Sequence, residues 1–185
     1  MKLFIPLMML LCSLPVLGQN YHTEYTYTEG AYNGITIQNS YPKGGLTYTA
    51  VNGREYAYLV FYTCISNHST TALTMNIDFS ANSFIVPTAP GIDFNIFVPA
   101  AEMTLAKATE FNYGFSVEDF LDTHLGKATK LNATIPPKQT KLFYTVLLST
   151  GRVEGVVRTG FFLEEGRLLY TVNGTHISGG ALTKQ

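Results

Sequence analysis

The sequence predicts a mainly β protein, an antiparallel sandwich with one short helix. Short segments rich in Tyr, Thr, Val, Ile and Phe follow one another from residue 21 to residue 172, and this composition is typical of strands. Glycine, proline and asparagine separate these segments, whereas only residues 101–126 carry a helical pattern. About eight to ten short strands spaced by turn signals favour a sandwich over a parallel sheet.

The longest predicted strands are residues 55–66 and 72–80, which we expect to pair as a hairpin across a polar turn at residues 67–71. Apolar and polar residues alternate along the second segment, the pattern of a strand with one buried face and one solvated face. The first segment has a matching inward face. The residues predicted to lie in the core are Leu59, Phe61, Leu73, Ile77 and Phe79.

Turn residues place the remaining strands. Asn33-Gly34 and Asn52-Gly53 predict two further hairpins, because Asn-Gly adopts the positive φ angles of tight turns. Residues 164–166 predict a third, a three-residue loop that ends on a left-handed glycine. The strands expected from these turns and from apolar runs are residues 21–28, 35–39, 46–50, 54–58, 84–86, 94–98, 130–135, 141–149, 155–163 and 167–172.

The sequence also predicts where two of these segments lie in a sheet, and that the C-terminus lies outside the sheets. Residues 141–149 are apolar on both faces, which indicates a central strand. The short runs around residues 84–98 are interrupted by prolines, as in edge strands or a crossover. Residues 179–185 are expected to form a loose tail.

The helix is predicted to begin at Ser116 and to end at Gly126. Ser116 and Asp119 have the spacing of a capping box, and acidic residues in a first turn suit the helix dipole. On this interpretation Asp122 is simply a solvated helix position.

The N-terminus resembles a secretory signal peptide. Lys2 precedes a short apolar run, and Val16-Leu17-Gly18 provides small or permissive residues where a signal peptidase reads them. We therefore expect residues 1–18 to be removed and residues 19–185 to form a single domain. Cys12 raises the alternative of a lipid anchor, but Leu11 occupies the position where that motif needs a small side chain. The predicted location is therefore secreted or periplasmic, without a lipid anchor.

Charge and hydropathy argue against nucleic-acid binding and against a membrane span in the mature chain. The chain has 12 Lys and Arg against 13 Asp and Glu, with a formal net charge of −1, and the basic residues are scattered. This distribution offers no footprint for nucleic acid. After the signal peptide no apolar run reaches the length of a membrane span.

The strand order resembles that of immunoglobulin-like domains in exported bacterial proteins. The similarity rests on the segments Cys64-Ile-Ser-Asn67, Leu73–Phe79, Leu131–Pro137 and Phe143–Leu147. The chain lacks the paired cysteines and core tryptophan of antibody domains. The resemblance implies an immunoglobulin-like sandwich in an exported protein of no assigned activity, and it implies no catalytic residues.

No residue pattern indicates a catalytic or metal site, and we predict no catalytic residue, no metal and no cofactor. The histidines lack the spacing of metal ligands, and Cys64 in an apolar strand suits an inert side chain. Asp119, Asp122 and His124 could act as acid, base or ligand, but capping accounts for the first. Glycan acceptor sequences begin at Asn67, Asn132 and Asn173, and their use stays open. The four histidines are His22, His68, His124 and His176.

Tyrosine usage is the strongest functional signal. Tyr56, Tyr58 and Tyr62 share the face opposite the predicted core, and Tyr25, Tyr27 and Tyr48 lie nearby in the sequence. They form either an aromatic surface for a glycan or protein partner or a face packed beneath a second sheet. We therefore predict an exported binding or interaction module rather than an enzyme. A hydrolase of the envelope or extracellular space, and a structural subunit joined through edge strands, are the alternatives.

Overall fold

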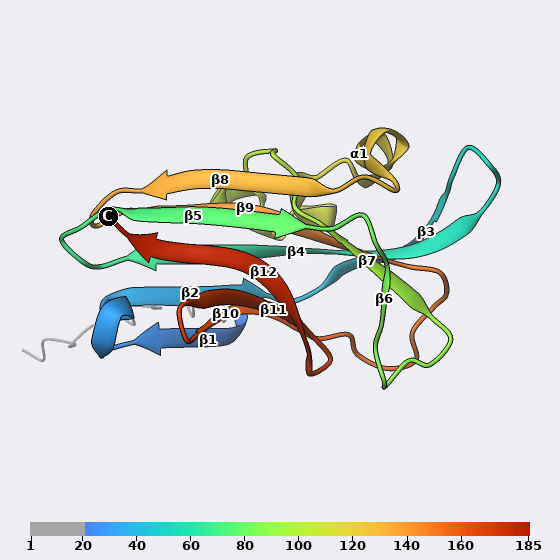
Figure 1. The fold of residues 1–185 in the computed structure, drawn as a ribbon. Coiled ribbons are helices and arrows are strands. Elements are labelled where there is room, and N and C mark those ends of the chain that lie inside the picture. Colours follow the sequence, from blue (N-terminus) through green and yellow to red (C-terminus); the bar gives the residue numbers. More distant parts are fainter. Residues whose placement is uncertain (1–20) are drawn as a thin grey trace, which may run out of the picture.

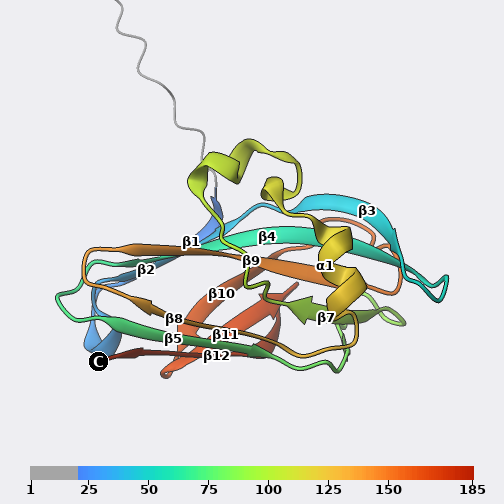
Figure 2. The ribbon, with the colours of Figure 1, turned by 90° about the horizontal axis from the view of Figure 1, so that it is seen from above.

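The computed structural model describes residues 21–185 and confirms a mainly β protein in which two antiparallel sheets form two layers (Figures 1 and 2). The predicted signal peptide, Cys12 and the cleavage position lie outside the described residues. Within residues 21–185, no helix combines the length and the apolar character needed to cross a bilayer.

The first layer, sheet A, has the order β1-β2-β4-β9-β7-β6, and β3 also pairs with β4. The second layer, sheet B, has the order β10-β11-β12-β5-β8. The strands of sheet A are β1 (Tyr21–Tyr27), β2 (Ile35–Ser40), β3 (Lys43–Thr49), β4 (Glu55–Asn67), β6 (Phe84–Ile85), β7 (Asp93–Phe97) and β9 (Thr140–Ser149). Those of sheet B are β5 (Leu73–Phe79), β8 (Thr129–Ile135), β10 (Thr159–Glu164), β11 (Arg167–Val172) and β12 (Thr175–Lys184).

Helical segments lie outside the two sheets. α1 (Val117–His124) is the predicted helix, and Gly126 follows it with a φ of +72°. The Ser116 hydroxyl donates to the Asp119 carboxylate at 2.5 Å and makes no hydrogen bond to the helix backbone. The described part of the chain, residues 21–185, also has three 3-10 helices: η1 (Gly30–Tyr32), η2 (Leu105–Thr109) and η3 (Phe111–Gly114).

Several predicted pairings are confirmed. β1 pairs with β2, β3 with β4, and β10 with β11, all antiparallel. β9 lies between β4 and β7 and is buried from Phe143 to Ser149, so it is central as its two apolar faces predicted. In the third hairpin, however, the loop has two residues, Glu165 and Gly166, with φ angles of +46° and +86°. It is shorter than expected because Glu164 pairs directly with Arg167.

The predicted hairpin of residues 55–80 is wrong. β4 belongs to sheet A and β5 to sheet B, so the chain crosses between layers at residues 68–72. The Asn67 amide holds this crossover by donating to the carbonyls of Thr71 at 2.8 Å and Ile135 at 3.0 Å. One apolar face on each strand suits stacked sheets as well as paired strands, which is why alternation alone could not separate the two. Because Asn67 is buried, the folded chain keeps its side chain from the surface.

The prediction of a loose C-terminal tail is also wrong, because residues 175–184 form β12 between β11 and β5. Gly179 and Gly180 lie at a register shift opposite Leu168 and Leu169. A Cβ atom on Gly180 would stand 2.0 Å from the carbonyl oxygen of Asn76 on β5. The two glycines suggested a loose tail, yet here they permit close approach of neighbouring backbones.

Pro42 interrupts the strand that β2 and β3 would otherwise form alongside β4. At the interruption the Ser40 hydroxyl takes the place of a backbone carbonyl, since it accepts the backbone N–H of Tyr62 at 2.9 Å in the buried interior. The sheet thus keeps this donor satisfied, as buried backbone groups require.

The core has two parts. The larger part lies between the sheets and contains four of the five predicted core residues fully buried, with Leu59 partly exposed at one end. The smaller part lies on the outer face of sheet A, beneath the segment that holds η3 and α1. Figure 2 shows this segment over β4 and β9. The outer core consists of Tyr48, Ala50, Tyr58, Val60, Tyr62, Phe97, Met103, Tyr113, Val117, Leu121, Tyr144, Val146 and Leu148.

Candidate binding site

The tyrosine face is covered, although by the helical segment rather than by a second sheet. Tyr58 and Tyr62 are only 3% and 1% exposed, while Tyr56 is half-buried at the margin. The ring of Tyr62 packs edge-on against Tyr113 with centroids 4.8 Å apart, and the Asn112 amide donates to the Tyr58 hydroxyl at 3.2 Å. Burial raises the pKa of Tyr62. Two of the three tyrosines therefore form no free surface here, and a ligand-binding role for the trio stays a prediction.

The polar residues of α1 serve the packing of the helix. Asp119 accepts the Ser116 hydroxyl, and Asp122 accepts the Tyr48 hydroxyl at 2.8 Å. Asp122 is exposed but is more than a solvated position, because this bond ties α1 to β3. The His124 ring stacks on Phe120 with centroids 4.3 Å apart.

Other sequence candidates are separate in space. Within residues 21–185, no group of three or more His, Cys, Asp or Glu side chains could hold a metal ion. Cys64 is a buried free thiol, and burial raises its pKa. A thiol in such surroundings has little thiolate character.

The most distinctive polar geometry lies where the edges of the two sheets meet, along β1 and β2 on one side and β10 on the other. The Asn39 side chain accepts the backbone N–H of Phe161 at 2.9 Å and donates to its carbonyl at 3.0 Å. The Tyr27 hydroxyl bonds the N–H and the carbonyl of Leu163 in the same way, at 2.6 and 3.3 Å. Side chains of sheet A thus satisfy the free edge of β10, which would otherwise offer unpaired groups to other chains. We call this boundary the seam.

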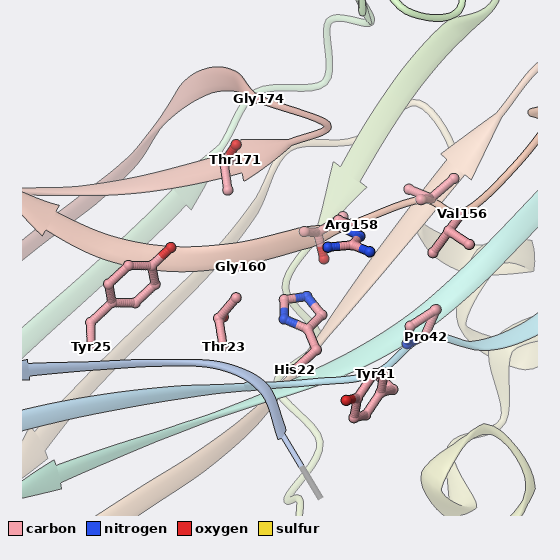
Figure 3. A pocket seen from close by; sticks show the side chains of 12 residues that line it. His22, Thr23, Tyr25, Tyr41, Pro42, Val156, Arg158, Gly160, Thr171 and Gly174 are labelled. Atoms are coloured by element: carbon pink, nitrogen blue, oxygen red, sulfur yellow. The ribbon is translucent and has the colours of Figure 1, made fainter. Parts of the chain in front are cut away.

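A cavity of about 230 Å³ opens at the end of the seam where β1 begins. The His22 ring lies in it between Tyr41 and Arg158 (Figure 3), with the ring centroids of His22 and Tyr41 5.9 Å apart. Tyr25 and Tyr41 are 36% and 51% exposed at its rim. We call this cavity the seam pocket; its lining is His22, Thr23, Tyr25, Tyr41, Pro42, Val156, Val157, Arg158, Thr159, Gly160, Thr171 and Gly174.

The electrostatics of the seam pocket favour an anionic group. Both ring nitrogens of His22 are buried without a partner in hydrogen-bonding geometry. Arg158 is exposed and makes no ion pair with any carboxylate in the part of the chain that the structure describes. Burial is the largest influence on the pKa of His22 and lowers it; the Thr159 backbone opposes this effect, and the smaller effect of the Arg158 charge lowers the pKa further. A bound anion would compensate both groups, because a buried polar atom without a partner is costly.

Neither His22 nor Arg158 stood out in the sequence as part of a site. They lie far apart along the chain and meet only because β1 and β10 are edge strands on the same side of the sandwich. Tyr25 was the one available signal, as a member of the wider tyrosine group, but no spacing connected it with Arg158.

No protein-family model, curated protein or solved structure matches this chain.

The lowered pKa of His22 gives a prediction about stability. Histidine in an unfolded chain has a pKa of about 6.5. Below that pH the unfolded chain binds a proton at His22 that the folded protein does not bind, so the free energy of unfolding decreases as the pH is lowered. We expect His22→Asn to lose less stability than the wild type between pH 8 and pH 5, measured by urea denaturation at both values. A difference between the two proteins that is the same at both pH values would contradict this prediction.

Proposed function

We propose that the chain is a binding module that captures an acidic saccharide in the seam pocket. The observation that carries the proposal is an unpaired guanidinium and an unpartnered histidine in one cavity with two exposed tyrosines at its rim. A guanidinium pairs with a carboxylate through two parallel hydrogen bonds. Tyrosine rings offer an apolar face for a sugar ring together with a polar hydroxyl.

The size and the lining of the pocket support one sugar unit. Its volume of about 230 Å³ is smaller than the roughly 300–1,000 Å³ of sites for drug-sized ligands. Thr23 and Thr171 are polar residues of the lining, and Gly160 contributes no side chain. Such a surface suits a ring with several hydroxyls and one carboxylate better than a flat protein epitope.

The place of action belongs to the same proposal. The signal-like N-terminus supports a secreted or periplasmic protein, where acidic polysaccharides are accessible ligands. Two stacked antiparallel sheets are compatible with an immunoglobulin-like module. The hydrolase and structural-subunit alternatives have no comparable observation in their favour within residues 21–185.

The test is calorimetric titration of the protein with trigalacturonate, with the neutral galactose trisaccharide as the uncharged comparison. We expect binding of the acidic ligand and at least about tenfold weaker binding after Arg158→Gln, since a hydrogen bond to a charged group contributes about 1.5–3 kcal/mol. Tyr41→Ala should weaken binding as well, because it removes an aromatic face at the rim.

Arg167→Gln is the matched control, because Arg167 is an exposed arginine of the neighbouring strand that does not line the pocket. It should bind like the wild type. Equal affinity for the acidic and neutral trisaccharides, or unchanged binding by Arg158→Gln, would reject the proposal. Equally tight binding of triglutamate would assign the pocket to acidic protein segments instead.

A further inference from the structure

A second cavity, of about 330 Å³, lies at the end of the sandwich where residues 150–158 pass from β9 to β10. This loop runs at the right of Figure 1, in orange. We call the cavity the end pocket. The apolar side chains that line it include Leu59, Phe94, Leu147, Val153 and Val157.

The end pocket is a place where the core between the sheets stays open. Phe61 and Ile65 on β4 are buried, yet Ala57 and Leu59, which continue the same face of that strand, are partly exposed. Gly45 on β3, the strand paired with this part of β4, adds no side chain to close the gap. Apolar surface left in contact with water makes the burial of an apolar ligand favourable.

Arg152 supplies a charge at this apolar cavity. It is exposed and has no carboxylate within ion-pair distance among residues 21–185, although Glu55 lines a neighbouring depression with it. Two other residues of the lining have a polar side chain. Ser149 already bonds the carbonyls of Gly151 at 2.8 Å and Ala57 at 3.4 Å, and the Tyr58 hydroxyl accepts the Asn112 amide at 3.2 Å. The free polar group is thus one guanidinium beside an apolar interior.

We propose that the end pocket is a binding site for a small amphiphile with an alkyl chain and a carboxylate head. The chain would replace water against Leu59, Phe94 and Leu147, and the head would pair with Arg152. A volume of about 330 Å³ is at the lower end of the range for small-molecule sites, about 300–1,000 Å³, which suits a medium-length chain. The site does not depend on the saccharide proposal, because its charged group is Arg152 and not Arg158.

Octanoate added to ¹⁵N-labelled protein tests this inference by amide chemical shifts. We expect the shifts to concentrate at the lining residues of β4, β7 and β9 and in the loop of residues 150–158. Ala57→Phe would fill the pocket without removing a buried side chain, and it should abolish these shifts. Thr49→Phe, which adds the same ring at an exposed position of β3, should leave them unchanged.

The chemistry of the ligand is tested with two further probes. Acetate lacks the chain and should not bind, and octanol lacks the charge and should bind more weakly than octanoate. Arg152→Gln should weaken octanoate binding about tenfold and leave octanol binding unchanged. The absence of shifts with octanoate, shifts that persist in Ala57→Phe, or shifts confined to residues around His22 would each overturn the inference. Arg158→Gln should leave octanoate binding intact. A failure of the saccharide proposal can therefore be distinguished from a failure of this inference.

Discussion

Replacing Gly180 by alanine should cost at least about 3 kcal/mol of unfolding free energy, among the larger effects of a single substitution. The added Cβ would stand 2.0 Å from the carbonyl oxygen of Asn76, which belongs to the backbone of the adjacent strand and cannot rotate away. The residue also has a φ of +123°, which side chains disfavour. β12 would have to move away from β5 and take Leu182 out of the core.

Gly174→Ala is the matched control for Gly180→Ala. Gly174 also has a positive φ, of +83°, but a Cβ there would meet no atom within 4 Å. It should therefore cost only the backbone strain, about 1–2 kcal/mol. Urea denaturation of both variants measures the difference. Equal losses would show that close strand approach at Gly180 does not matter.

Asn39→Leu should destabilise the protein by about 3–4 kcal/mol, because a buried donor or acceptor left unpaired costs about 1–3 kcal/mol. The substitution removes both partners of the Phe161 backbone and the acceptor of the Thr63 hydroxyl, all in the buried interior. The free edge of β10 would lose one of the two side chains that satisfy it. Hydrogen exchange at the Phe161 amide should also become faster, since that bond holds the seam closed.

Gln38→Leu provides the comparison for Asn39→Leu. Gln38 is the preceding residue of β2, and its amide bonds Glu24 at 2.7 Å on the exposed face. Its loss should change stability by no more than about 0.5 kcal/mol, as is usual for surface positions. An Asn39→Leu protein that unfolds within about 1 kcal/mol of the wild type would mean that water replaces the amide at the seam.

The seam both satisfies the edge of β10 and borders the seam pocket. Asn39 and Tyr27 seal the edge of β10 along most of its length, and the pocket opens where this sealing ends, beside His22. Thus the features that prevent edge pairing with other chains also define the borders of the proposed saccharide site. A substitution at Asn39 is expected to affect both stability and binding, whereas Arg158→Gln is expected to affect binding alone.

The sequence allowed most strands and the three short hairpins to be predicted, but not the pairing of strands that lie farther apart in the chain. Alternation along residues 73–79 correctly predicted a strand with one buried face, while the pairing with residues 55–66 was wrong because the two strands face each other across the core. The glycines at 179 and 180 indicated a loose tail when considered alone. Only the neighbouring Asn76 carbonyl shows why a strand needs them at that point.

The sequence by itself determined most strand segments, the helix α1 and the apolar side of strands such as β5, because these depend on turn residues and on periodicity within a few positions. The tertiary structure alone decided how the strands outside the short hairpins pair, what covers Tyr58 and Tyr62, and that His22 meets Arg158. These features arise from contacts between residues far apart in the chain, and a single sequence carries no local signal for such contacts. The two proposed pockets belong to this second group, since each lies where separate strands come together.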